Sequence, residues 1–137
     1  LAEKHGLPGI VRDFIKTHHG TTSTGYFYTK YLNDGGDPDD VADFFYDGEK
    51  AVTKEQVILM ICDALAAASR SLKDYSAESI SELVERITNG KIEDGQLSDS
   101  EISMSELSTA KEVMKSYIQQ MYHARVAYPK RLARGAK

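Results

Sequence analysis

The sequence predicts an all-α fold of five or six helices. Three observations support it: apolar residues recur at helical spacing, capping patterns precede the long runs, and no segment alternates as a strand would. The longest apolar run, Val57 to Ala68, lies within residues 53–72, and Thr53 with Gln56 forms a capping-box pattern at its start. Because a helix that is apolar on every side is typically buried, we expect the other helices to surround this one.

The other helices are predicted from their caps and apolar spacing. We expect them over 9–18, over 25–32, from Pro38 to near Phe45 behind an Asp37 cap, from Ser76 to Gly90, and from a Ser103–Glu106 capping box to Pro129. Three of them carry apolar faces that should contact the core. The face of the first helix consists of Ile10, Val11, Phe14 and Ile15, and that of the helix from Ser76 consists of Ile80, Leu83, Val84 and Ile87. The face of the last helix consists of Leu107, Ala110, Met114, Tyr117, Ile118 and Met121, and Met104 is also expected in the core.

Composition excludes several functional classes. The 137 residues suffice for one domain or part of a larger one, and the net charge of −4 gives no basic surface for a nucleic-acid polymer. Asp63 interrupts the longest apolar run, so no apolar run reaches the roughly 18 residues of a membrane span.

The single cysteine, Cys62, is expected to be buried and to fill the core. No phosphate-binding glycine loop or serine nucleophile elbow occurs.

Asp63 is the single charge in the apolar run. A buried carboxylate is costly unless it is paired, protonated or bound to metal. A structural ion pair and a role as metal ligand or acid/base group both remain open. Arg70 lies two turns later on the same helical face, about 10 Å away, and is one candidate partner.

The adjacent His18 and His19 precede Gly20, which is typical of a helix end. Neighbouring helical residues point about 100° apart, so both imidazoles can flank one site only at such an end. The simpler interpretation is that one of the two histidines lies in the core and the other is exposed. The alternative is that both ligate a metal. Histidine and carboxylate ligands on packed helices, here with Asp63, are typical of Mn, Fe or Zn sites that hydrolyse phosphodiesters.

Several segments together resemble the HD-domain phosphohydrolases, in particular the subfamily fused to seven transmembrane helices, whose members hydrolyse cyclic di-AMP. The resemblance covers nearly the whole chain. It rests on His18-His19-Gly20-Thr21, Thr53-Lys54-Glu55-Gln56, Asp63, Ala67-Ala68-Ser69-Arg70-Ser71-Leu72 and Tyr122-His123-x-Arg125-Val126-x-Tyr128-Pro129.

The resemblance implies the C-terminal part of an HD domain at 1–129, followed by a basic tail at 130–137. Two Mn or Fe ions would be bound, with His18, His19 and Asp63 among their ligands. The substrate would be a cyclic dinucleotide, contacted by Arg70, Thr21 and Lys30. The parent would be a bacterial inner-membrane signalling protein with a cytoplasmic HD domain, and a homodimer is one assembly it suggests. The family's earlier histidine and His-Asp pair have no counterpart here, so the fragment alone is expected to be inactive.

Two departures from the family pattern affect the expected substrate contacts. Residues 46–49 replace a proline-rich run, and 64–67 lack an acidic residue. One alternative is therefore a degenerate HD module that binds a nucleotide or a partner without catalysis. Another is a plain helical interaction domain, in which His18, His19 and Asp63 would not converge.

Overall fold

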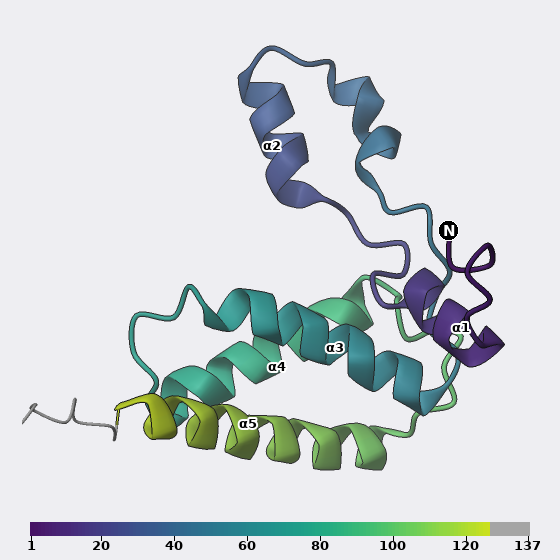
Figure 1. The fold of residues 1–137 in the computed structure, drawn as a ribbon. Helices are drawn as coiled ribbons and strands as arrows, with labels where there is room; N and C mark the ends of the chain where they lie inside the picture. The colour runs from purple at the N-terminus through teal and green to yellow at the C-terminus, as the bar shows by residue number, and fades with distance from the viewer. Residues whose placement is uncertain (127–137) are drawn as a thin grey trace, which may run out of the picture.

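The computed structural model describes residues 1–126, which form five α-helices and one 3₁₀-helix (Figure 1). In this part of the chain the only pairing of extended backbone is an isolated bridge between Ser23 and Phe45, which confirms the all-α prediction. The elements are α1 (Gly9–Thr17), α2 (Gly25–Asn33), η1 (Pro38–Phe44), α3 (Lys54–Ser69), α4 (Ala77–Glu93) and α5 (Met104–Val126).

The core lies between the three long helices α3, α4 and α5 (Figure 1). Their starts follow the predicted caps: the Thr53 hydroxyl and the Gln56 side chain complete a capping box on α3, and Ser103 and Glu106 do the same on α5. The core is formed by residues from all three helices, among them Val57, Met60, Ile61, Ile80, Leu83, Val84, Leu107, Met114 and Ile118.

Helix α3 is buried on one side only, so the prediction of an entirely buried helix was wrong. Ile61 is fully buried, whereas Leu59 is 41% exposed and Asp63 and Cys62 are also exposed. The reason is that α4 packs against one face of α3 and α1 contacts the helix over a short stretch, whereas α5 packs mainly against α4. The apolar residues away from these contacts remain accessible.

Three further expectations about exposure or length were wrong. Most of the apolar stripe of α1 is exposed, including Ile10 and Ile15, because this short helix packs mainly against α3. On α5, Met104 and Tyr117 are exposed because they lie off the face that meets α4. Helix α4 continues past Gly90 to Glu93, and the chain turns instead at Gly95, which has a left-handed φ of 73°.

Helices α2 and η1 pack against each other in an arm that extends away from the three-helix core (Figure 1). The Phe44 ring contacts the rings of Tyr28 and Tyr31, at centroid distances of 5.2 and 5.0 Å. Asp37 accepts a hydrogen bond from the Asp39 amide and so caps η1 as predicted.

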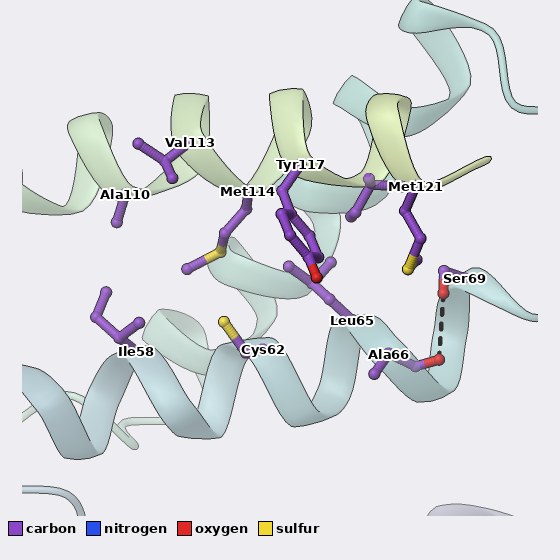
Figure 2. A pocket seen from close by; sticks show the side chains of 11 residues that line it. Ile58, Cys62, Leu65, Ala66, Ser69, Ala110, Val113, Met114, Tyr117 and Met121 are labelled. Atoms are coloured by element: carbon purple, nitrogen blue, oxygen red, sulfur yellow. Dashed lines mark hydrogen bonds between the residues drawn. The ribbon is translucent and has the colours of Figure 1, made fainter. Parts of the chain in front are cut away.

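An apolar groove of about 550 Å³ runs between α3 and α5 (Figure 2). Cys62, Met114 and Tyr117 lie along it, and burial raises the pKa of the Cys62 thiol. This lining offers little that would bind a charged ligand. Within residues 1–126, no helix has both the length and the apolarity required to cross a membrane.

Candidate metal centre

The two adjacent histidines lie at the end of α1, in a tight turn. The His18 amide still bonds to the Phe14 carbonyl, and Gly20 then takes a left-handed φ of 54° that ends the helix. The His18 and His19 ring centroids are 4.1 Å apart. The predicted helix end therefore does bring both imidazoles to one place.

The hydrogen bonds of His18 determine which of its ring nitrogens is available. Its Nδ1 lies 3.1 Å from the Phe14 carbonyl oxygen and 2.9 Å from that of Ile15. Carbonyl oxygens only accept, so we assign the proton of the neutral ring to Nδ1. The Nε2 lone pair is then free, which is the usual state of a histidine that ligates a metal.

His19 meets Asp63, which lies in the middle of α3. The His19 Nδ1 is 3.5 Å from the Asp63 Oδ2, and the two side chains are 39% and 48% exposed. The ring of Tyr46 stacks on the other side of His19, with centroids 4.4 Å apart and planes inclined by 17°. Asp63 thus has the partner that a carboxylate on this helix was expected to need.

The electrostatic surroundings favour a neutral His19. Burial lowers the pKa of its imidazole below 6.5, the electrostatic effects of His18 and Lys91 lower it further, and the carboxylate of Asp63 partly opposes them. Burial also lowers the pKa of Lys91, while Asp94 and Asp63 raise it. Because only the neutral ring has a free lone pair, these effects favour the form that can bind metal.

The spacing of His19 and Asp63 fits a shared metal ion. Nitrogen and oxygen ligands lie about 2.1 Å from a divalent metal, so two ligand atoms of one ion are at most about 4.2 Å apart. The observed 3.5 Å is within that limit. Among the residues that the structure describes, however, no group of three or more His, Cys, Asp or Glu side chains is placed to hold a metal. A pair of ligands is fewer than a metal site in a protein usually has.

The three residues expected to contact substrate lie in different places. Thr21 is in the turn next to the histidines. Arg70 caps the C-terminus of α3 and forms no ion pair with Asp63 within the described residues; Asp63 contacts His19. Lys30 lies on α2 in the arm, away from α3 (Figure 1). The basic tail at 130–137 falls outside the described residues.

Sequence reasoning missed three residues around the histidines: Tyr46, Lys91 and Gln96. Tyr46 stacks on His19, Lys91 acts on it electrostatically, and Gln96 hydrogen-bonds to the following turn. Lys91 and Gln96 lie in or beside a polar segment that resembles an ordinary connector, with no local signal of long-range contacts. Tyr46 opens the 46–49 segment, whose departure from the family pattern was the one available signal.

Comparisons with known proteins agree with the helical arrangement. No protein-family model matches the chain. It is 36% identical over 134 residues to the uncharacterized protein slr0104 of Synechocystis, covering 95% of this chain and 16% of that protein. It is 31% and 33% identical over 129 residues to the cyclic-di-AMP phosphodiesterases PgpH of Bacillus subtilis and Listeria monocytogenes, covering 94% of this chain and 18% of each. The chain thus spans less than a fifth of these relatives.

Solved structures with a similar fold include the HD domain of one of these relatives. The crystal structure of the L. monocytogenes PgpH HD domain matches with a TM-score of 0.80 and 30% identity, over 89% of this chain and 56% of that one. The same domain in complex with cyclic-di-AMP matches with a TM-score of 0.81, also at 30% identity, over 88% and 56%. By sequence the chain is homologous to the PgpH cyclic-di-AMP phosphodiesterases, and by fold it matches the HD domain of the L. monocytogenes protein.

Proposed function

We propose that this chain is part of a metal-dependent phosphodiesterase that hydrolyses a cyclic dinucleotide, with cyclic di-AMP as the substrate. The observation that carries the proposal is the 3.5 Å approach of His19 Nδ1 to Asp63 Oδ2, in a fold that matches an HD domain solved with cyclic-di-AMP. The names of the PgpH relatives support the reaction class.

His18, His19 and Asp63 are the residues that would hold divalent metal, with manganese or iron as the proposed ions. When bound, such metals activate water and stabilise the charge that develops on phosphate oxygens. The protein's own contribution is positional. Hydrogen bonds from Nδ1 to two carbonyls orient His18, and the half-exposed Asp63 carboxylate faces His19 from α3, where solvent and substrate can reach it.

The complete site requires more donors than these three. We infer that they come from parts of the parent protein outside this chain, so the fragment alone would not hydrolyse substrate. We also infer that the parent is a bacterial inner-membrane protein with this domain in the cytoplasm, and a homodimer remains a prediction. Of the proposed substrate contacts, Thr21 adjoins the histidines, whereas Arg70 and Lys30 have no contact that supports the role.

Hydrolysis of cyclic di-AMP by the parent protein in Mn²⁺ tests this proposal, with product measured by chromatography. We expect His19→Ala and Asp63→Asn each to lower kcat/KM by about 100-fold or more, because even the outer partners of metal ligands contribute 10–100-fold. His5→Ala and Asp99→Asn are matched controls at exposed positions and should have no effect. A wild-type parent that binds cyclic di-AMP but does not hydrolyse it would favour the degenerate, binding-only module.

A further inference from the structure

Gln96 is a buried side chain whose oxygen and nitrogen atoms both form hydrogen bonds. It lies in the connector after α4 and is 2% exposed. Its Oε1 accepts a hydrogen bond from the Thr21 amide at 3.0 Å, and its Nε2 donates to the Thr21 hydroxyl at 3.1 Å and to Asp94 Oδ2 at 3.3 Å. A buried amide is costly unless it is satisfied in this way. The contact joins residues 75 positions apart in the sequence.

The amide also fits closely against the turn that carries the histidines. A Cβ atom at Gly20 would lie 2.3 Å from Gln96 Oε1, and Gly20 has the left-handed φ that favours glycine. The turn is continuous with His19, whose carbonyl accepts bonds from both the amide and the hydroxyl of Thr22. Gln96 therefore holds a short, hydrogen-bonded segment that begins at the metal-ligating histidines.

We propose that Gln96 is a positioning residue: its hydrogen bonds to Thr21 fix the turn after α1 and so hold the His19 imidazole beside Asp63. This inference rests on the metal-binding role of those side chains proposed above. Gln96 itself touches neither imidazole, and its effect passes through the backbone of Gly20 and Thr21.

A second set of contacts, from residues 46–49, supports the same turn. The Tyr46 amide donates to the Thr22 carbonyl at 2.9 Å, and the Glu49 amide donates to the Lys16 carbonyl at 3.1 Å. Gly48 packs so closely that a Cβ there would lie 2.3 Å from the Gly20 carbonyl oxygen. This support comes from backbone groups and would persist without Gln96. Loss of Gln96 should therefore loosen the metal site without abolishing it.

The test compares Gln96→Leu with Gln96→Glu in the parent protein. Leucine is similar in size but leaves the Thr21 amide unsatisfied. Glutamate retains an acceptor for that amide, and burial beside the Asp94 carboxylate favours its protonated form, which also retains a donor. Gln120→Leu, at an exposed position on α5, is the matched control. The readouts are the Kd for Mn²⁺, from electron paramagnetic resonance of the free ion, and the Mn²⁺ concentration that gives half-maximal hydrolysis.

We expect Gln96→Leu to raise the Mn²⁺ Kd about 10-fold, Gln96→Glu to restore part of that loss, and Gln120→Leu to change nothing. Saturating Mn²⁺ should recover most of the maximal rate of Gln96→Leu. Both readouts are taken where circular dichroism shows each variant to be fully folded, because Mn²⁺ binding to a partly unfolded variant would itself raise the apparent Kd. A merely structural role of Gln96 would then leave the Kd and the half-saturation point at their wild-type values, and that result would overturn the inference. If the wild-type parent binds no Mn²⁺, the proposed function fails as well. Unchanged Mn²⁺ affinity in Gln96→Leu, beside a wild type that binds the ion, overturns the role of Gln96 alone.

Discussion

The one-sided burial of α3 gives a quantitative prediction for two positions on the same helix. Ile61 is fully buried in the core, and Leu59, two residues earlier, is 41% exposed. Substitution by alanine removes three carbon atoms from either side chain. Any difference between the two losses in free energy of unfolding therefore reflects the surroundings of the side chain and not the number of atoms removed.

The magnitude follows from burial. Three buried carbons at about 0.8 kcal/mol each give about 2.4 kcal/mol of lost transfer free energy. At Ile61 the space left behind is closed to water, and this cavity brings the expected loss to about 3–4 kcal/mol. At Leu59 about 40% of the residue is already in water, which leaves a loss of about 1–1.5 kcal/mol. Helix propensity changes by only a few tenths of a kcal/mol in either case.

Urea denaturation of the chain, followed by circular dichroism, measures both free energies of unfolding. With a slope of about 1–3 kcal/mol per molar urea, the difference of about 2 kcal/mol should separate the two midpoints by about 0.7–2 M. Equal losses at the two positions would refute the one-sided packing, because they would mean that Leu59 is covered as fully as Ile61.

Three further predictions follow from the histidine turn and the α3 cap. In the metal-free chain, NMR titration should place the pKa of His19 below 6.5, with Asp63→Asn lowering it further and Lys91→Met raising it; opposite shifts would contradict the assigned electrostatics. Because the folded-state pKa is lowered, the contribution of His19 to the free energy of unfolding is present above pH 6.5 and declines as the pH falls through that value. Gly20→Ala should lower the free energy of unfolding by about 1–3 kcal/mol, measured with urea, since the left-handed φ and the contact with Gln96 both oppose a Cβ; an unchanged midpoint would argue against this turn. Thr53→Ala should cost about 1 kcal/mol in the same assay, because the Thr53 hydroxyl accepts from the Gln56 amide, and a loss near zero would mean that the cap is not formed in solution.

Local features of the sequence predicted most of the helix boundaries. The Thr53 and Ser103 capping boxes and the Asp37 cap act within a few residues, so they can be identified without knowledge of the tertiary structure. The prediction that α4 ends at Gly90 was wrong because a helix can continue through one glycine, at a cost of about 1 kcal/mol, when its neighbours are well packed. Here the helix continues with Thr88 fully buried just before the glycine.

The candidate site could be predicted only at residues whose type and position in the sequence suggest a metal ligand. The adjacent histidines at a helix end and the lone carboxylate of Asp63 could be found from the sequence, and the 3.5 Å contact joins two of them as expected. The exposure of Asp63, which the apolar run around it wrongly predicted to be buried, could not be foreseen, because it depends on which face of α3 the other helices cover. Gln96 was missed for a related reason: its contacts lie 75 residues away in the sequence.

The number of Mn²⁺ ions bound per chain of the parent protein is the most direct test of the central claim, that His18, His19 and Asp63 hold catalytic metal. It can be measured by equilibrium dialysis and elemental analysis, with Asp99→Asn as the exposed control. The account predicts two ions in the wild type and in the control, and the loss of at least one tightly bound ion in Asp63→Asn and in His19→Ala. Wild-type stoichiometry and affinity in both of these variants would contradict it.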